Sequence, residues 1–562
     1  MSQARTVEAP LLSGAERDAF LARVRLSVSA EDYGKIEALC AALPKLVQMI
    51  EQEHMTMRKL RHLLFGAKTE QTERVCPPAS PAEPTRPPPK PQCKGHGRLK
   101  AKDYTGARWV EVPHPTLHAG CRCPLCAQGA VRAQKTKAIL LRIEGSPPIA
   151  ATGYELARLR CDTCGAVFTA PTPAEAGQEK YAPSVAVTVA VLRYGTGMPH
   201  YRLARLQQSL GVPLPESTQW ELLAPLGELA QPVFAELVAQ AANAPLLHHD
   251  DTTMRILDLR RPGSTSAAEL ARLAPHRKGT FTTNVLAEVA SHPVALYFTG
   301  WQHAGENLAA VLRQRAADLA PPIQMCDALS RNVCPQSHTI LGFCLSHARR
   351  EFVTVAPSFP ADCRHVLEAL REVYRFEAEA KALGLAHEPR LVHHQTHSLP
   401  VLDHLKVWMR EKIDGKHVEP NSGLGQAIGY MLKHWEPLTL FLRQPGAPLD
   451  NNRCEQALKM AILHRKNSLS YKTLLGAQTG DLFMSLINTC RLNRVNPFAY
   501  LLAIAKHAKE VASNPAAWLP WNYPPSGKVD ALDHDPPGSP CKSSSRNRAA
   551  SPPSLSTASA DN

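Results

Sequence analysis

The segment APLLHHDDTTMRILDL, residues 244–259, carries two adjacent carboxylates, Asp250 and Asp251, between two apolar runs. Apolar and β-branched residues on both sides predict a β-strand whose acidic side chains emerge at one edge of a sheet. Segments of the same character follow at 279–290 (GTFTTNVLAEVA) and 293–300 (PVALYFTG) and predict two further strands. The core around Asp250 is therefore expected to be a β-sheet.

Two more acids stand where another strand and a helix are predicted. Asp327 ends the short apolar run of APPIQMCDALSRN, residues 320–332, and lies 77 positions after Asp250. Glu455 lies 128 positions further on, in a basic segment with helical periodicity. Two strand-borne aspartates and a helix-borne glutamate match a ribonuclease-H-like phosphoryl-transfer site. In such a site carboxylates hold two magnesium ions, which activate the attacking group and stabilise the leaving oxygen.

Each of these acids also has an ordinary structural interpretation. Glu455 follows Asn452 by three residues, which is the spacing of a capping-box pair at the start of a helix. Asp250 and Asp327 could equally occupy exposed or turn positions. The spacing of the residues alone leaves both alternatives open.

Basic and polar residues close to the acids in the sequence are candidate DNA contacts. The segment HTILGFCLSHARREFV, residues 338–353, predicts one more strand or the start of a helix. In the helix that carries Glu455, basic side chains ten and eleven residues later would lie about 15 Å along the axis, too far to share a metal site but suited to flanking phosphates. The candidate DNA-binding residues are Arg349, Arg350, Arg465, Lys466 and Asn467.

The composition favours a polyanionic partner. The chain has 562 residues and a net charge of +14, and nucleic acid is the commonest partner of a protein with this surplus, although a merely basic soluble protein is the alternative. The first residues lack the apolar core of a signal peptide, and no uncharged apolar run of membrane-spanning length is evident. We therefore expect a cytoplasmic protein without membrane segments, in which the 15 cysteines serve as metal ligands and buried thiols rather than disulfides.

Four cysteines have the spacing of a structural zinc site. Cys123 and Cys126 form one CxxC pair, and Cys161 and Cys164 form a second pair. Two such knuckles supply the four thiolates of one tetrahedral zinc ion and leave no open position for catalysis. Cys121 is a spare thiol beside the first pair.

The regions before the predicted sheet have distinct patterns. Apolar residues at heptad spacing over 36–64 predict a coiled coil, although Pro44 interrupts the pattern and a helix packed on its own chain is the alternative. The segment MPHYRLARLQQSLGVPLPESTQWELLAPL, residues 198–226, predicts helix, turn and helix, as in DNA-reading domains and in many ordinary helical hairpins. Thr218 and Glu221 have capping-box spacing at the expected start of the second helix.

Several segments together resemble one family. HHDDTTMRIL, CLSHARREF, PLDNNRCEQALKMAILHRKNSLS and SLINTCRLNRVNPFAYLL are similar, in this order, to motifs of the bacterial insertion-sequence-66 family of DDE transposases. LRHLLFGAKTEQTERV, the paired CxxC knuckles and WLPWNY also resemble that family. The similarity covers roughly residues 35 to 523, and the DNN…E and RKN block is its most specific part.

The resemblance implies a multidomain α+β fold. It has a ribonuclease-H-like α/β catalytic core with a helical insertion, preceded by a coiled-coil helix, a zinc-ribbon-like module and a helical DNA-binding region. The expected boundaries are 1–75 for the zipper-like region, 76–96 for a proline-rich linker, 97–175 for the zinc-binding module, 176–243 for the helical and possibly helix-turn-helix region, 244–510 for the core with its insertion at about 355–440, and 511–562 for a mostly disordered C-terminal segment.

The resemblance also implies a function. It identifies Asp250, Asp327 and Glu455 as catalytic and as ligands of Mg²⁺ or Mn²⁺, in a transposase that binds the terminal inverted repeats of its element, cleaves them and transfers the strands to target DNA. Expected partners are DNA, further copies of the chain and two small accessory proteins of the same element, in the bacterial cytoplasm at the nucleoid.

Two departures from the family motifs bear on this function. The first motif usually reads Asp-Glu-Thr, whereas this chain has Asp250-Asp251-Thr252, which makes Asp251 a rival for the first acid. The second motif usually reads Asp-Gly-Tyr and here reads Asp327-Ala328-Leu329. The alternative function is an inactive or repurposed DNA-binding protein derived from a transposase.

Overall fold

The computed structural model describes most of the chain from residue 179 to residue 523. Within this range residues 262, 274–275, 278 and 335–337 are outside the description. The stretches described before it are 14–29, 31–38, 40, 71–76, 112–134, 139–140, 143, 145–160, 162, 164 and 167–177. Most of the predicted coiled coil, nearly all of the proline-rich linker, Cys161 and the tail from 524 onward lie outside the described residues.

The chain divides into two compact units. One comprises Met1–Cys93 with Pro147–Tyr523, and the other comprises Lys94–Ser146 with Pro524–Asn562. The boundary at residue 147 falls inside the expected zinc-binding module, so the two CxxC pairs belong to different units.

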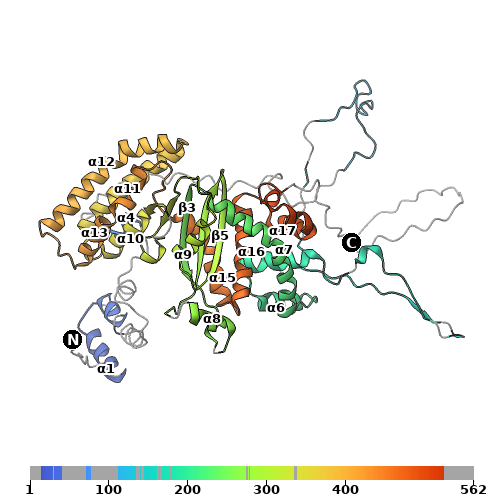
Figure 1. Cartoon of the computed structure of the whole chain (residues 1–562), viewed down its shortest axis with the longest axis horizontal. Helices are drawn as coiled ribbons and strands as arrows, with labels where there is room; N and C mark the ends of the chain where they lie inside the picture. Colours follow the sequence, from blue (N-terminus) through green and yellow to red (C-terminus); the bar gives the residue numbers. More distant parts are fainter. Residues whose placement is uncertain are drawn as a thin grey trace, which may run out of the picture. The chain divides into compact units, whose positions relative to one another are not determined.

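A five-stranded mixed sheet forms the centre of the larger unit (Figure 1). Its strand order is β5-β4-β3-β6-β7, with β3–β4 and β4–β5 antiparallel and β3–β6 and β6–β7 parallel. All the strands predicted from the apolar runs are present, and the last run provides both a strand and the start of a helix. The strands are β3 (Leu246–Thr253), β4 (Phe281–Val289), β5 (His292–Gly300), β6 (Ile323–Cys326) and β7 (Ile340–Phe343).

Helix α16 (Leu474–Leu492) covers the outer edge of β5, the edge that pairs with no other strand of this sheet. Side chains on one stripe of the helix, at positions 481, 485 and 489, accept hydrogen bonds from the backbone N–H groups of alternate residues of the strand. An uncovered edge strand presents unpaired N–H groups that invite pairing with another chain, and this helix occupies them. The pairs are Asp481 with Thr299 (2.6 Å), Ser485 with Tyr297 (2.9 Å) and Thr489 with Ala295 (3.1 Å).

The helical region before the sheet has a helix–turn–helix outline. Helix α6 (His200–Ser209) is followed by a turn in which Gly211 has φ +76°, and then by α7 (Glu216–Ala242). The predicted capping box is wrong, because α7 begins at Glu216, before Thr218, with Pro215 as its N-cap. Instead, Gln219 is buried and hydrogen-bonds to the backbone of α6 and to His200.

Helix α7 is long and apolar enough to cross a membrane by length and composition alone. It packs against α5 (Pro183–Ala190), α16 and strands β4 and β5, and it contributes many residues to the larger hydrophobic core. Its apolar composition is therefore accounted for by its place in the core.

A helical insertion separates β7 from the helix that carries Glu455. It begins with α10 (Leu345–Val355) and continues through α11 (Pro360–Ala382), α12 (His387–Asp414), α13 (Gly423–Lys433), α14 (Trp435–Leu438) and η6 (Leu440–Leu442). These helices form a second hydrophobic core with β6 and β7, on the side of the sheet away from β5 (Figure 1). The chain leaves and returns at nearly the same point. At the start of the insertion the Leu345 N–H donates, at 3.0 Å, to the carbonyl of Leu449, which lies between the insertion and the helix that carries Glu455.

The folded chain continues past the expected end of the core at residue 510. Helix α17 (Pro497–Lys506) is followed by α18 (Ala508–Ser513) and η7 (Pro515–Trp518). The Tyr500 hydroxyl donates to the Trp518 carbonyl at 2.7 Å, and Trp518 and Leu519 are buried in the larger core. The segment as far as residue 523 is therefore part of the fold.

Candidate active site

Strand register brings Asp250 and Asp327 together. The parallel strands β3 and β6 pair Leu246 with Ile323 and His248 with Met325, so each residue of β6 lies 77 positions after its partner in β3. The same register, continued by two residues, sets Asp250 opposite Asp327, which directly follows the end of β6 at Cys326, while β3 continues to Thr253 in its pairing with β4. The 77-residue spacing is therefore the register of this strand pair.

The two carboxylates lie close enough to influence each other. Burial is the main cause that raises the pKa of Asp250 from its ordinary value near 3.8 to about 7, and the charge of Asp327 is the next largest. Asp251 and Glu455 add smaller contributions of the same sign. A buried carboxyl group with other acids beside it favours either a bound proton or a cation.

Helix α15 (Asn452–Ser468) is tied to β3 by the residue just before it. The Asn451 side chain is fully buried, and its Nδ2 donates to the His249 carbonyl at 2.9 Å. Its Oδ1 lies 3.0 Å from Nδ1 of His248, and burial lowers the pKa of that imidazole to about 4, so Nδ1–H of a neutral ring donates to the amide. These bonds hold the first turn of α15 beside the residues that precede Asp250.

Glu455 lies in the first turn of α15, and its carboxylate is not a cap. Asn451 is the N-cap residue and makes no side-chain cap hydrogen bond, while the Asn452 side chain bonds to Asp450 at 2.9 Å. The capping-box interpretation of Asn452 and Glu455 is therefore wrong. Instead, the Oε1 atom of Glu455 faces Nδ1 of His347 at 3.7 Å.

The side chain of Asp251 pairs with other groups than that of Asp250. Successive side chains of a strand point to opposite faces of the sheet, so Asp251 and Asp250 face different ways. The side chain of Asp251 is only 2% exposed, and its oxygens lie 3.2 Å from a guanidinium nitrogen of Arg331 and 3.5 Å from Nδ1 of His303. A carboxylate paired with these two groups is a weaker candidate for a metal ligand than Asp250.

The residues after Asp327 differ from the second family motif, but the Asp327 side chain is still held by two hydrogen bonds. Its Oδ1 accepts hydrogen bonds from the backbone N–H of Leu329, at 3.2 Å, and from the side-chain amide of Asn332. The first of these bonds uses a backbone group that any residue at position 329 except proline would supply. Asn332 lies in η5 (Ser330–Asn332), and no sequence pattern pointed to its role.

Comparisons with known proteins bear on what this site does. A family model described as "Transposase IS66 family" matches residues 179–479, more than half of the chain. The chain belongs to this transposase family. Two uncharacterized proteins of Sinorhizobium fredii are among its relatives. The protein y4jD is 27% identical over 65% of this chain and 71% of its own length, and y4hP is 26% identical over 65% and 67%.

The basic residues that the sequence analysis named as candidate DNA contacts have different surroundings. Arg465 donates to the Thr252 hydroxyl and to the Thr253 carbonyl, both at 2.8 Å, and so fastens α15 to the end of β3. Lys466 is exposed, and Asn467 is half-buried. Arg349 and Arg350 are half-buried on α10, where Arg349 contacts the Thr72 hydroxyl at 3.4 Å.

The first CxxC pair lies in a hydrogen-bonded turn, while the zinc site remains a prediction. The Cys123 N–H donates to the Gly129 carbonyl at 2.7 Å, and the Ala127 N–H donates to the Cys123 carbonyl at 2.8 Å. The backbone N–H of Gly129, followed by that of Gln128, lowers the pKa of the Cys126 thiol, as suits a metal ligand. Cys164 belongs to the other unit, and Cys161 lies outside the described residues.

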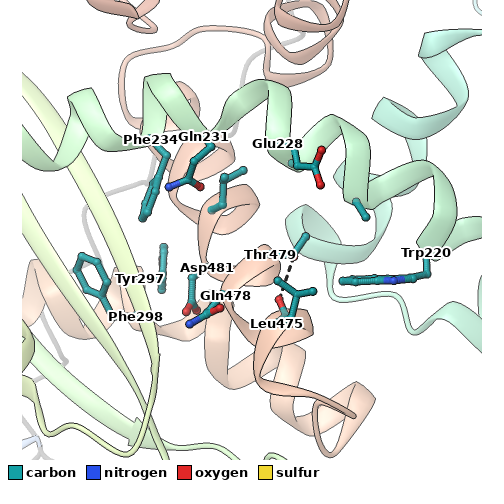
Figure 2. Close-up of a pocket in the computed structure, with 13 residues that line it drawn as sticks. Trp220, Glu228, Gln231, Phe234, Tyr297, Phe298, Leu475, Gln478, Thr479 and Asp481 are labelled. Carbon is teal, nitrogen blue, oxygen red and sulfur yellow. Dashed lines mark hydrogen bonds between the residues drawn. The ribbon is translucent and has the colours of Figure 1, made fainter. Parts of the chain in front are cut away.

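A cavity of about 680 Å³ is lined by residues of the larger unit (Figure 2). It is formed by α7, α16 and β5, and none of the three candidate catalytic acids lines it. Asp481 is at its wall, where burial raises the pKa of that carboxyl to about 7. The bonds that Asp481 accepts from Thr299 give it a structural role at the edge of the sheet.

Replacing Asn451 with Ala is expected to destabilise the protein by about 2–4 kcal/mol. The change leaves two buried groups without partners, the Nδ1–H of His248 and the carbonyl of His249, at a cost of about 1–3 kcal/mol each. Asn452→Ala is the matched control, because that neighbouring side chain is exposed and bonds only to Asp450. Urea unfolding of both variants measures the difference. Equal midpoints would show that Asn451 does not hold α15 to the sheet.

Proposed function

We propose that the chain is an active DNA transposase. It binds the ends of its element, cleaves them by metal-dependent phosphodiester chemistry and transfers the freed strands to target DNA. One observation supports this proposal: burial first, and then the charges of Asp327 and Glu455, raise the pKa of Asp250, which lies on β3 next to the end of β6. A divalent cation between these side chains would offset the cost of burying the Asp250 charge beside other acids.

The donor set fits magnesium or manganese. All three side chains offer carboxylate oxygens, the hard ligands that these ions prefer. The Oε1 atom of Glu455 is buried and has no hydrogen-bond partner among the described residues, as expected of an oxygen reserved for a cation. A divalent cation held by these oxygens would polarise the scissile phosphate and lower the pKa of the attacking water or 3′-hydroxyl.

The protein's own groups have separate tasks in this chemistry. Asp250 and Asp327 are fixed by the sheet, Asp250 by the N–H of Asp251 at 2.8 Å, so their oxygens are positioned before DNA arrives. Asn451 and Arg465 hold the two ends of α15 against β3, and this fixes the position of Glu455 relative to the strand. Preorganised charge of this kind stabilises a transition state without further rearrangement.

The finer architecture is part of the same proposal. Three antiparallel strands followed by two parallel ones, with helices packed on the sheet, support a ribonuclease-H-like core. The hydrogen-bonded turn at Cys123 and Cys126 supports a zinc-ribbon-like module, and the share of Cys161 and Cys164 in it remains an expectation from the sequence. The exposed arginines of α6, Arg202 and Arg205, support DNA contact by the helical region. A coiled-coil N-terminus, self-association, the accessory proteins and a nucleoid location remain expectations from the family.

The function is tested by incubating the full chain with DNA that carries both element ends. We expect nicks at the ends with 3′-hydroxyl products in Mg²⁺ or Mn²⁺, joined products when target DNA is added, and neither after chelation. Binding to the ends without cleavage in either metal would instead favour the inactive DNA-binding alternative.

Replacing Lys466 with Ala is expected to weaken DNA binding equally for all sequences. The loss of one phosphate contact should lower the slope of log affinity against log salt by about one unit. Arg465→Ala should lower the slope similarly but also reduce stability, because Arg465 bonds to Thr252 and Thr253 whereas Lys466 is exposed. Salt-dependent binding and thermal unfolding separate the two effects. An unchanged slope for Lys466→Ala would remove this residue from the DNA-binding surface.

A further inference from the structure

A second set of metal-ligand atoms lies next to the three acids. Cys344 is the N-cap residue of α10, His347 lies in the first turn of that helix, and Glu455 reaches them from α15. One ligand atom from each of the three residues lies within 4.8 Å of the other two. A Cys-x-x-His pair at a helix start and a carboxylate from another helix thus converge on one point.

Two of these atoms lack the partners that buried polar groups normally have. Nδ1 of His347 and Oε1 of Glu455 are both buried without a hydrogen bond among the described residues. They face each other at 3.7 Å, which is longer than an ordinary hydrogen bond. Two ligand atoms of a tetrahedral ion with bonds of about 2.0–2.1 Å lie roughly 3.3 Å apart. A movement of the two side chains toward each other by a few tenths of an ångström would therefore let both atoms bind one metal ion.

The sulfur atom of Cys344 is held by two backbone groups. The backbone N–H of Asn451 donates to Sγ of Cys344 at 3.2 Å, and the backbone N–H of His347 also points at this sulfur. Burial raises the pKa of the Cys344 thiol to about 12 and these two N–H groups offset only part of that rise, so a metal ion that binds here displaces the thiol proton. The same contact links the cysteine to the start of α15, so the ligands from the two helices are held in fixed relation.

We propose that Cys344, His347 and Glu455 form a binding site for a transition-metal ion of the zinc class. One sulfur, one nitrogen and one oxygen ligand suit zinc, whereas magnesium takes oxygen ligands only. The fourth position is open to water. This site is separate from the predicted cysteine zinc site, and it contains only one of the three acids.

The site shares Glu455 with the proposed magnesium site, so this consequence rests on the proposed function. A carboxylate that binds zinc through Oε1 beside Cys344 is withdrawn from the cation between Asp250 and Asp327. Zinc at this position therefore inhibits magnesium-dependent cleavage. The alternative is that a protonated His347 simply forms an ion pair with Glu455 and no metal binds.

The test measures zinc bound by the full chain after chelation, dialysis and return of zinc. Wild type is expected to hold one equivalent more than His347→Gln or Cys344→Ser, while zinc at the cysteine knuckles is common to all three. Cys490→Ser is the control, because Cys490 is a fully buried thiol on α16 outside the cluster, and it should match wild type. Cobalt substitution should show thiolate-to-metal absorption that falls by the same increment in Cys344→Ser. Equal zinc and equal cobalt absorption in wild type and both variants would overturn the site.

A cleavage assay tests whether the two sites share Glu455. In saturating magnesium, half-inhibition of His347→Gln should need at least about tenfold more zinc than wild type, since loss of metal-site partners costs at least that factor in affinity. Equal inhibition of both proteins would overturn the sharing of Glu455. If wild type does not cleave at all, the proposed function fails, while the zinc equivalents still decide whether the site exists.

Discussion

Glu455→Gln is expected to lower magnesium-dependent end cleavage by about a thousandfold or more and to leave DNA affinity unchanged or slightly higher. A carboxylate that holds a catalytic cation supports several kcal/mol of transition-state stabilisation, and each 1.36 kcal/mol is a factor of ten in rate. Glutamine keeps the shape of the side chain but removes its charge. Affinity is spared because the change removes a negative charge near DNA phosphates.

The matched control for this variant is Glu288→Gln. Glu288 is an exposed residue of the neighbouring strand β4, and its carboxylate pairs with Arg453 of α15 at 3.1 Å. Its loss changes the local charge by the same amount without touching the three acids, so cleavage should stay within about twofold to threefold of wild type. Substantial cleavage by Glu455→Gln would exclude this glutamate as the third acid.

Asp250→Asn is expected to abolish cleavage and yet stabilise the metal-free protein at neutral and alkaline pH. The pKa of Asp250 is about 7 in the folded state and near 3.8 ordinarily, so folding favours its protonated form. The associated stability is fully present below about pH 4 and is lost as the pH rises through 7. A pKa difference of about three units lowers the free energy of unfolding at alkaline pH by at most about 4 kcal/mol. Asparagine does not ionise, so the variant does not lose this stability as the pH rises.

Asp481 provides the comparison for this pH effect. Burial raises its pKa to about 7 as well, but it lies at the α16–β5 contact and accepts two hydrogen bonds from Thr299. Asp481→Asn should flatten the pH dependence of unfolding without abolishing cleavage. Unfolding midpoints at pH 5 and 8, with and without magnesium, distinguish the two aspartates. Magnesium should raise the midpoint of wild type and of Asp481→Asn and should not raise that of Asp250→Asn.

The strands and the acids could be predicted because their signals are local. The apolar segments around 293–300 and 320–326 marked β5 and β6, and apolar residues on both sides of Asp250 and Asp251 marked β3. The 77-residue spacing of Asp250 and Asp327 equals the register of β3 and β6, but it did not by itself predict that these strands pair. Motif similarity then supplied Glu455, whose position no local pattern could fix.

The residues that hold the site together could not be predicted, because their partners are distant in the sequence. Asn451 had no predicted role, and its amide bonds to residues of β3 some 200 positions earlier. The capping box of Asn452 and Glu455, which was the alternative interpretation, is wrong because Asn451 is the N-cap residue and the Asn452 side chain bonds to Asp450. Cys344 and His347 were seen as a motif, but their contact with Glu455 depends on how α10 and α15 meet.

The hydrogen bond between Leu345 and Leu449 has a consequence for how such proteins diversify. It closes the insertion at its base, so more than a hundred residues leave and rejoin the core at nearly the same point. Changes of length between these ends need not move the glutamate that follows, and the entropic cost of a longer closed segment grows only with the logarithm of its length. The insertion is therefore a natural place for lineages to gain or lose helices, and for an engineer to graft a reporter domain, while the chemistry beneath it stays in register.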